Sequence, residues 1–272
     1  MKNTSYWLSL CLVAASSASA ASWDDGAPVA EAKTQLSPAP SATGGSVAGQ
    51  FDSYTFTMSW EPTFCEGKPS ATECRSQSAD RFDATNLSLH GLWPDQNGDA
   101  RHAYGYCGVD SATQALDRAP TWCQLPEPPL SDATRSALST TMPGTASCLD
   151  HHEWIKHGSC SAMAAEDYFA LAAALVRQVA GTNFGRFLSA HAGQTVTADD
   201  ALSAFEQDFG SGSRDLVAMN CTNANGAQAL LEVRVHLANP LRPASELASM
   251  LVSIGDRGNC PSSFLLDPIP GS

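Results

Sequence analysis

The sequence predicts a single α+β domain with a central, mainly antiparallel sheet that is flanked by helices and stapled by disulfides. Three observations lead to this class. Strand-like and helix-like segments are mixed along the chain without a regular βαβ alternation. An even number of cysteines remains once an N-terminal leader is set aside. About 250 residues then suffice to bury one full core. The domain is expected over residues 50–272.

The N-terminus reads as a secretory signal over residues 1–20. Lys2 supplies a positive start, Trp7 to Ala15 an apolar run, and Ala18-Ser19-Ala20 a small-residue cleavage site. Residues 21–49 are rich in Ala, Ser, Pro and Gly and lack periodicity, so we expect a flexible leader. No later stretch approaches the ~20 apolar residues of a membrane span, and no membrane association is expected.

Four strands are expected from alternating apolar and polar residues. The first runs from Tyr54 to Trp60 and should have one buried face. The second contains Leu87 and Leu89 and leads into His90. Leu231 to Leu237 form the third, and Asp215 to Cys221 the fourth. One face of each strand should therefore lie against the core and the other face in solvent.

Three helices are expected from capping residues and helical periodicity. Ser131 caps a helix that runs to about Thr140 and ends before Pro143-Gly144. Residues 164–179 carry apolar side chains at helical spacing, closed by Gly181. Thr197 begins a third helix through a capping box in which Asp200 replaces the preferred glutamate.

The cysteine count predicts export to an oxidising compartment. Of nine cysteines, Cys11 lies in the apolar run of the signal and should be lost with it. Eight remain, which suggests four disulfides in a periplasmic or secreted protein. Their connectivity is one of 105 formal possibilities. The eight are Cys65, Cys74, Cys107, Cys123, Cys148, Cys160, Cys221 and Cys260.

The net charge of the chain limits the kinds of molecule that it can bind. The chain has a formal net charge of −13, which argues against a broad basic surface that binds duplex nucleic acid. A small cationic pocket for one phosphate remains compatible with it. Histidines would supply such charge below their ordinary pKa of ~6.5, so we expect the best activity in mild acid.

The segment from His151 to Cys160 holds three histidines, a carboxylate, a lysine and a cysteine. If it is helical, residues four apart share a face, so His152 lies beside Lys156 and Glu153 beside His157. A second segment, Leu87 to Asp95, places His90 close to an aromatic ring. Acid, base and cation together suit a reaction that moves protons around an anionic centre, and indicate phosphoryl transfer on RNA.

A metal site is the alternative for the first segment. A zincin helix requires His-Glu-x-x-His, but the positions that would hold the second histidine are Ile155 and Lys156. His152 and His157 are five residues apart, roughly 140° around a helix, and should not readily share one ion. A cationic Lys156 would also repel a dication. We therefore predict no metal and no other cofactor.

Two motifs resemble the active-site motifs of the ribonuclease T2 family. They are Leu89-His90-Gly91-Leu92-Trp93-Pro94 and His152-Glu153-Trp154-x-Lys156-His157-Gly158-Ser159-Cys160. The opening stretch Trp60-Glu61-Pro62-Thr63-Phe64-Cys65 is similar too, and the resemblance covers roughly residues 51 to 260. It implies a secreted, metal-independent endoribonuclease with an α+β fold.

The resemblance also implies roles for the site residues. His157 would be the base, His90 the acid, and His152 a phosphate ligand. Glu153 and Lys156 would support the transition state. Trp93 would stack on a base, and Asp95 would bind a base amino group in a second subsite. Cys107 with Cys160 and Cys221 with Cys260 would be paired. Cys65 with Cys74 and Cys123 with Cys148 are then the remaining pairings, although the sequence leaves the connectivity of these four cysteines open.

Each of these residues also has a plain structural interpretation. His90 could be a hydrogen-bonded core histidine, Lys156 a solvated helix residue and Asp95 a surface turn residue. His151 rather than His152 could face the site, although we take His151 as structural. The loop from Asn97 to Tyr106 matches no base-binding pattern, so base preference stays open.

The function predicted from the sequence is a monomeric endoribonuclease for single-stranded RNA. Cleavage would proceed by transphosphorylation through a 2′,3′-cyclic phosphate to a 3′-phosphate. The alternatives are a catalytically inactive RNA-binding or signalling module of the same fold, and a metallohydrolase.

Overall fold

The computed structural model describes residues 46–96, 104–119, 121–224, 226–242, 244–253, 255 and 257–269. The expected signal and most of the expected leader lie outside these residues. The last part of that leader does not behave as a separate segment. The Gly49 N–H donates to the Cys160 carbonyl at 2.9 Å, and the Tyr104 hydroxyl donates to the carbonyl of Val47. The packed region therefore begins a few residues before the expected boundary at residue 50.

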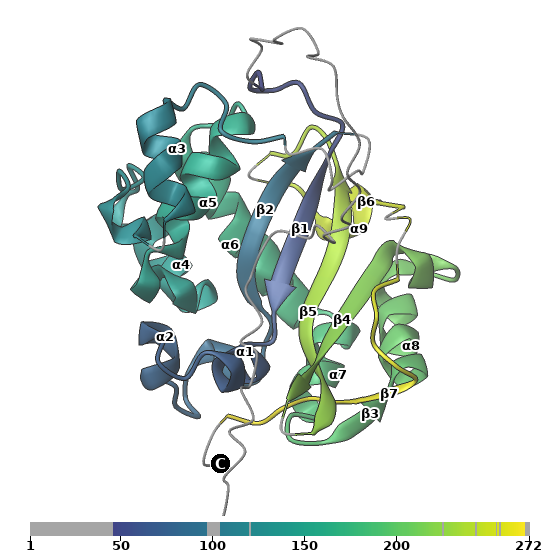
Figure 1. Ribbon diagram of the computed structural model, residues 1–272. Coiled ribbons are helices and arrows are strands. Elements are labelled where there is room, and N and C mark those ends of the chain that lie inside the picture. The colour runs from purple at the N-terminus through teal and green to yellow at the C-terminus, as the bar shows by residue number, and fades with distance from the viewer. Residues whose placement is uncertain are drawn as a thin grey trace, which may run out of the picture.

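One seven-stranded sheet forms the centre of the domain (Figure 1). Its main path is β2-β1-β5-β7-β3, and β4 and β6 also pair with β5. All pairs are antiparallel except β5 with β7, which confirms the α+β class. The strands are β1 (Ser53–Ser59), β2 (Ser88–Asp95), β3 (Thr195–Thr197), β4 (Val217–Ala224), β5 (Ala227–Ala238), β6 (Leu251–Val252) and β7 (Ser263–Leu265).

The two faces of the sheet differ in chemistry. In the antiparallel register, Phe56 and Met58 of β1 lie opposite Val235 and Val233 of β5, on the apolar face. The intervening residues share the other face, which is polar: Thr55, Thr57 and Ser59 of β1 lie opposite His236, Arg234 and Glu232 of β5.

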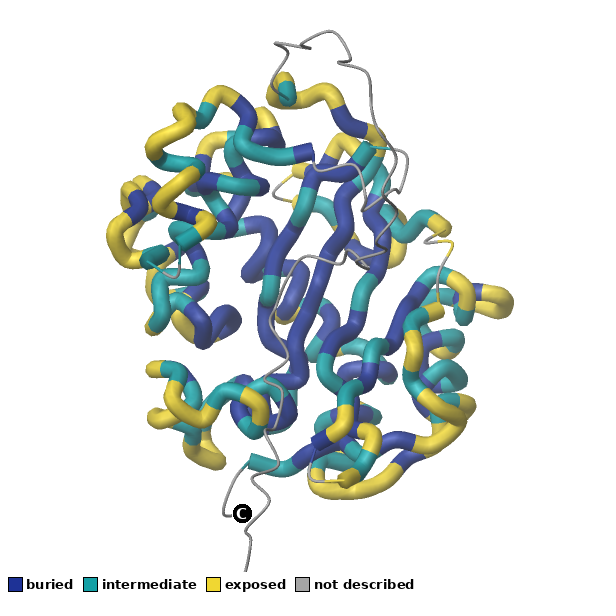
Figure 2. The backbone as a smooth tube through the Cα atoms, viewed as in Figure 1, coloured by how far each residue is buried: buried dark blue, intermediate teal, exposed yellow. Residues whose placement is uncertain are grey.

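The expectation that the first strand has only one buried face is wrong. The side chain of Thr57 is fully buried, and Thr55 and Ser59 are buried as well. Figure 2 shows the central strands as an almost continuous buried layer. Alternation identified the two faces correctly, but the polar face is covered by side chains of neighbouring strands and helices rather than by solvent. A second, polar interior therefore lies on this side of the sheet.

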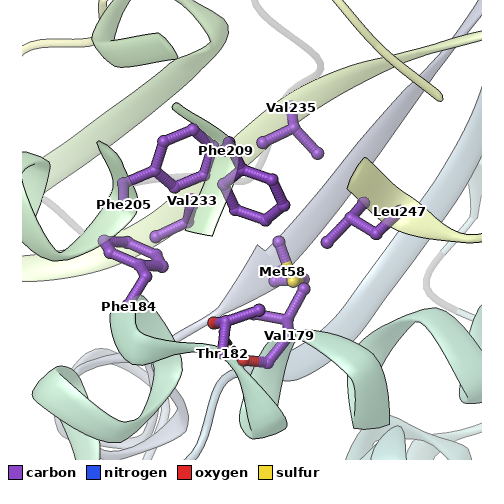
Figure 3. Close-up of a pocket in the computed structure, with 9 residues that line it drawn as sticks. All are labelled: Met58, Val179, Thr182, Phe184, Phe205, Phe209, Val233, Val235 and Leu247. Carbon is purple, nitrogen blue, oxygen red and sulfur yellow. Dashed lines mark hydrogen bonds between the residues drawn. The ribbon is translucent and has the colours of Figure 1, made fainter. Parts of the chain in front are cut away.

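Helices cover the apolar face. Side chains of α6, α7 and α8 converge with Met58 and Val233 around a small cavity whose lining is apolar except for Thr182 (Figure 3). With no convergent polar groups, this cavity is part of the core. The helices are α1 (Glu61–Gly67), α2 (Thr72–Arg75), α3 (Ser111–Arg118), α4 (Asp132–Thr141), α5 (Leu149–Lys156), α6 (Ala165–Gly181), α7 (Asn183–Ala190), α8 (Ala198–Phe209) and α9 (Leu247–Met250).

The three expected helices correspond to α4, α6 and α8. The Ser131 hydroxyl accepts from the Thr134 N–H, and the Thr197 hydroxyl accepts from the Asp200 N–H, as the capping residues predict. Of the described helices, no single one is long and apolar enough to cross a membrane; only α5 and its 3-10 extension taken together with α6, bent by 108° between them, meet that criterion of length and composition.

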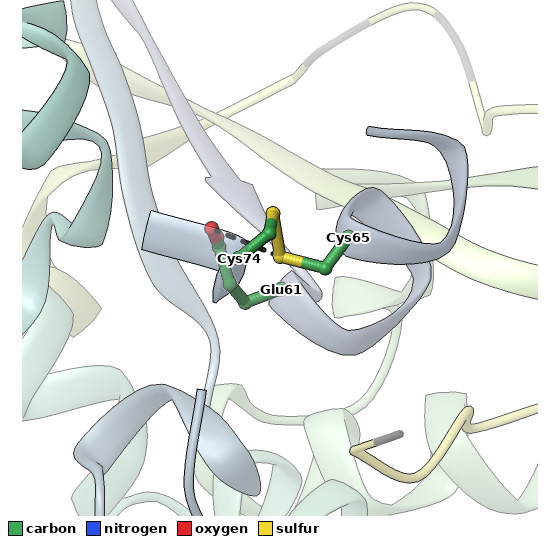
Figure 4. A group of neighbouring side chains, drawn as sticks. All are labelled: Glu61, Cys65 and Cys74. Atoms are coloured by element: carbon green, nitrogen blue, oxygen red, sulfur yellow. Dashed lines mark hydrogen bonds between the residues drawn. A yellow bond between two sulfur atoms is a disulfide. The ribbon is translucent and has the colours of Figure 1, made fainter. Parts of the chain in front are cut away.

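Four disulfides staple the fold, and all four pairings agree with the resemblance: Cys65–Cys74, Cys107–Cys160, Cys123–Cys148 and Cys221–Cys260. Glu61 lies beside the first of them, its carboxylate 4.0 Å from the Cys65 sulfur (Figure 4). Because both sulfurs are bonded to each other, neither offers a thiolate to a metal ion.

Candidate active site

The first histidine of the candidate site is presented by a bulge in β2. Thr57 of β1 pairs with Gly91, and Met58 pairs with Leu89, so the register of the two strands skips His90. A bulge changes the direction of a side chain, and here it places the His90 ring over the polar face. The His90 Nδ1 atom lies 3.0 Å from the Glu232 carboxylate of β5.

Gly91 allows the next element of the site to form. A Cβ atom at this position would lie 2.1 Å from Trp93 Nε1 and 2.3 Å from Glu153 Oε2. The indole of Trp93 therefore folds back over the glycine, and its N–H donates to Glu153 Oε2 at 2.7 Å. This hydrogen bond joins β2 to α5, and only a glycine leaves room for it.

Glu153 and His157 come from the end of α5. The helix ends at Lys156, and His157 caps it, its N–H donating to the Glu153 carbonyl at 3.1 Å. The next residue, Gly158, lies so close to Trp154 that a Cβ atom would be 2.4 Å from the indole. The chain consequently turns off the helix, and the His157 ring stacks on Trp93 with 5.1 Å between centroids.

The Trp93 ring contacts both of the histidines that the sequence singled out. It stacks on His157 and meets the His90 ring edge to face, with centroids 5.2 Å apart. The two motifs are therefore brought together in one site. Trp93 is half-buried, and one of its faces is occupied by His157.

His152 lies on the other side of His157 and is held by residues outside both motifs. Its Nδ1 atom is 2.7 Å from the buried Asp117 carboxylate, and its ring stacks on Trp122 with a centroid separation of 4.5 Å. The Tyr106 hydroxyl donates to the second oxygen of Asp117 at 2.6 Å. The ring centroids of His152 and His157 are 6.1 Å apart.

Neither Asp117 nor Trp122 was identified from the sequence. The only available signal was their proximity to paired cysteines. Cys123 follows Trp122 and is bonded to Cys148 at the start of α5. The Cys107–Cys160 bond ties the segment of Tyr106 to the end of the catalytic motif. These disulfides thus brace the surroundings of His152, and neither directly joins α5 to β2.

The structure resolves the choice between the two adjacent histidines. The His151 ring points away, with Nδ1 at 3.0 Å from the Leu125 carbonyl, whereas His152 faces His157. Lys156 is half-buried beside the segment of Gly105 and Tyr106, and its carbonyl accepts from the Tyr106 N–H at 2.8 Å. Its ammonium acts on His157, whose pKa it helps to lower.

Asp95 lies inside the domain rather than at its surface. It is buried at the end of β2, so the interpretation as a surface turn residue is wrong. Its carboxylate accepts from the Thr55 hydroxyl at 3.2 Å, and that hydroxyl also lies 3.1 Å from His236 Nε2. Asp95 therefore belongs to a buried polar network, and its contact with a nucleic acid base stays a prediction.

The two histidines beside Trp93 are driven toward opposite protonation states. Burial is the main reason that the pKa of His157 lies well below its ordinary value of 6.5, with the charges of Lys156, His152 and His90 acting in the same direction. Both of its ring nitrogens lack a hydrogen-bond partner among the described residues. Burial alone would lower the pKa of His90 too, but the hydrogen bond and charge of Glu232, assisted by Glu153, raise it overall.

The carboxylate of Glu153 is buried, which disfavours its charged form. It is 1% exposed, and one of its oxygens has no hydrogen-bond partner within the described part of the chain. Burial raises its pKa, although His152, His90 and the Trp93 N–H each favour the ionised form. Glu153 is therefore a group whose charge depends on its neighbours.

The spacing reasoning against a shared metal ion is wrong in one respect. One ligand atom each from His152, Glu153 and His157 lies within 4.8 Å of the others. Five residues on an ideal helix would point the two rings apart, but His157 is past the end of α5 and its ring turns toward His152. The geometry admits a metal ion, and the expectation of a metal-independent site stays a prediction.

Comparisons with known proteins agree with the resemblance. A model of the Ribonuclease T2 family matches residues 51–247. Ribonuclease I of Escherichia coli (strain K12) is 29% identical over 237 residues, covering 80% of this chain and 87% of that protein. A ribonuclease of Aeromonas hydrophila is 30% identical over 129 residues, which cover 47% of this chain and 46% of that protein. The structure of ribonuclease MC1 from bitter gourd seeds covers 79% of this chain and 100% of its own, with a TM-score of 0.52 at 20% identity, and shares the fold.

Proposed function

Because the chain belongs to the Ribonuclease T2 family, we propose that it is an endoribonuclease that cleaves single-stranded RNA without a metal ion. The observation that carries this proposal is the pair of histidines in contact with Trp93, whose environments push their pKa values in opposite directions. Two titratable groups that differ in this way are suited to act as base and acid in one reaction.

His157 is the base of the proposed reaction. With its lowered pKa it is neutral in mild acid, so a ring nitrogen can accept the proton of the ribose 2′-hydroxyl. The 2′-oxygen then attacks the adjacent phosphorus. His90, held protonated beside Glu232, gives its proton to the departing 5′-oxygen as the bond from phosphorus to that oxygen breaks. The products are a 2′,3′-cyclic phosphate and a free 5′-hydroxyl.

Hydrolysis of the cyclic phosphate follows with the histidine roles reversed. His90, now neutral, takes a proton from water, which attacks phosphorus, and His157 returns its proton to the 2′-oxygen. The 3′-phosphate is released and both histidines regain their initial states. A nucleic acid without the 2′-hydroxyl has no internal nucleophile and should not be cleaved.

The remaining motif residues surround the reacting phosphate in this proposal. His152 and Lys156 supply positive charge to the phosphate and to the more highly charged transition state. Glu153 orients the site through Trp93 and, when ionised, favours the protonated form of His90. The half-buried Trp93 ring is a candidate base contact. Asp95 is the proposed acceptor for a base amino group in a second subsite, since its carboxylate has acceptor positions besides the one that Thr55 occupies.

We also propose a periplasmic or secreted monomer. The four disulfides and the signal-like residues 1–20 support export to an oxidising compartment. The net charge of −13 supports a substrate that enters as a flexible single strand and is held locally by a few cations.

A metal-dependent hydrolase is the second candidate, and the close approach of ligand atoms from His152, Glu153 and His157 favours it. A catalytically inactive RNA-binding module is a third. RNA digestion between pH 5 and pH 7, with and without excess chelator, separates them. We expect chelator-insensitive cleavage of RNA and none of DNA. Activity that is lost only with chelator would identify a metal enzyme, and binding without cleavage would identify the inactive module.

The variant for this assay is His157→Ala, with His191→Ala as its matched control. His191 lies at the end of α7, packed on Phe187 and hydrogen-bonded to its carbonyl. Loss of a general base costs about 10²- to 10⁴-fold in rate, so His157→Ala should be nearly inactive and His191→Ala close to wild type. Equal activities of the two variants would contradict the proposed role of His157.

A further inference from the structure

Glu232 lies outside both sequence motifs and contacts a candidate catalytic histidine directly. It belongs to β5, which is far from His90 in sequence but places Glu232 on the same polar face of the sheet. Its carboxylate is 3% exposed. One oxygen lies 3.0 Å from His90 Nδ1, and the other accepts from Arg234 Nε at 2.8 Å.

The arrangement is a chain of three charged groups in a buried setting. The guanidinium of Arg234 also places NH2 at 2.6 Å from the Glu232 carboxylate, in a two-point contact. Burial works against the charge of Glu232, but its hydrogen bond to His90 and the charge of Arg234 keep the pKa of this carboxyl below its ordinary value. Glu232 is therefore an anion that is fixed on both sides.

The Glu232 anion determines which nitrogen of the His90 ring can donate a proton to the substrate. The Nδ1–H of His90 is directed at Glu232, so Nε2 is the ring nitrogen that can deliver a proton to a substrate. The groups facing His90 are Glu232 and Arg234 from β5 and Glu153 from α5, with the ring of Trp93 against its edge. His157 stacks on that same ring. Among these, Glu232 makes the direct hydrogen bond.

We propose that Glu232 is the positioning residue that keeps His90 protonated and directs its Nε2–H toward the leaving 5′-oxygen. This inference rests on the proposed function and adds a residue that neither motif contains. In the cleavage step the electron pair of the broken phosphorus–oxygen bond goes to the 5′-oxygen, which takes the Nε2 proton. His90 becomes neutral and keeps its Nδ1–H on Glu232, ready to accept a proton from water in the second step.

The test uses two substrates that differ in their leaving group. A dinucleotide releases a 5′-alkoxide and needs an acid, whereas the 4-nitrophenyl ester of the same 3′-nucleotide releases a stable phenolate and does not. We expect Glu232→Gln to lower kcat on the dinucleotide by about 100-fold, within the usual contribution of general acid catalysis. Its effect on the nitrophenyl ester should be small. Equal losses on both substrates would indicate a merely structural residue and overturn the proposal.

The matched control is Glu127→Gln, since Glu127 is exposed and paired with Arg135 away from the site. It should leave both rates at the wild-type level. The pH profile gives a second readout. On the dinucleotide, the alkaline limb of Glu232→Gln should move to lower pH, because His90 loses the partner that keeps its proton. An unmoved limb would overturn the proposal.

Two measurements keep the proposal testable if Glu232→Gln does not fold. In the wild-type protein, the His90 imidazole should titrate by NMR above 6.5, the ordinary histidine value, and above His157. In Glu232→Asp, which keeps the charge but shortens the reach to Nδ1, dinucleotide cleavage should fall more than ester cleavage. A wild-type His90 that titrates below 6.5 would refute the inference. Failure of wild type to cleave any RNA would instead refute the proposed function.

Discussion

The hydrogen bond between Trp93 and Glu153 offers the sharpest test of the site outside the histidines. Replacing Trp93 with Phe keeps an aromatic ring to stack on His157 but removes the N–H that donates to Glu153 at 2.7 Å. Glu153 is nearly fully buried, and its other oxygen already lacks a partner among the described residues. The variant therefore deprives a buried carboxylate of the side-chain hydrogen bond that it accepts among the described residues.

The size of the effect follows from that geometry. A hydrogen bond to a charged group contributes about 1.5–3 kcal/mol, and the Trp93 bond favours only the ionised form of Glu153. In the proposed reaction this corresponds to a loss of about 10- to 150-fold in kcat/KM in mild acid. Burial already raises the pKa of Glu153, and removal of the donor raises it further. The acidic limb of the pH profile should therefore move to higher pH.

The assay is kcat/KM for dinucleotide cleavage between pH 4 and pH 8, with Trp154→Phe as the matched control. Trp154 lies next to Glu153 on α5, but its ring packs against Tyr168 and Phe169 in the core. Trp154→Phe should lower stability while leaving the pH profile unchanged. If the acidic limb of Trp93→Phe coincided with that of the wild type, the ionised form of Glu153 would not be required, and the reasoning would fail.

Two further predictions concern carboxylates outside the motifs. Asp117→Asn should raise KM about tenfold with little change in kcat. The proposed phosphate ligand His152 loses its anionic partner, while the proposed acid and base are untouched. Steady-state kinetics measure both constants, and a selective loss of kcat would contradict the prediction. Burial raises the folded-state pKa of Glu61 from 4.5 to about 8, so its contribution to stability is complete below pH 4.5 and is lost as the pH rises through 8. Urea unfolding should show stability falling across that range by up to about 1.4 kcal/mol per pH unit from this group. Glu61→Gln should flatten the slope, and an equally steep slope in the variant would exclude Glu61 as its source.

Local patterns predicted much of this fold because they depend on neighbouring residues. Ser131 and Thr197 cap helices through atoms three residues away, and the first strand shows its two faces in its own alternation. The pairing of the cysteines followed from resemblance alone. The alternation of apolar and polar residues did not show that the polar face of the sheet is buried. That burial depends on side chains from other strands and helices. Thr57 is therefore buried where a solvated residue was expected.

The parts of the site that were missed depend on contacts between distant segments. Glu232 meets His90 only because β5 and β2 both flank β1 and because a bulge turns His90. Asp117 of α3 reaches His152 of α5, although the two residues are 35 positions apart in the sequence and α4 lies between them. The inferred divergence of His152 and His157 failed for a related reason, since helical spacing was extended one residue beyond the end of the helix. Spacing in a sequence predicts direction only while the regular element continues.

The three histidines of the site differ mainly in whether a carboxylate contacts the imidazole ring. His90 has Glu232, His152 has Asp117, and His157 has no hydrogen-bond partner for its ring among the described residues. A buried imidazole without an anion stays neutral most easily, whereas one beside a carboxylate is favoured as a cation. The two motifs therefore supply three similar rings, and two carboxylates from outside them give His90 and His152 an anionic partner that His157 lacks among the described residues. This also reconciles a chain of net charge −13 with an anionic substrate, because screening over about 8–10 Å leaves the phosphate to respond to these few nearby groups.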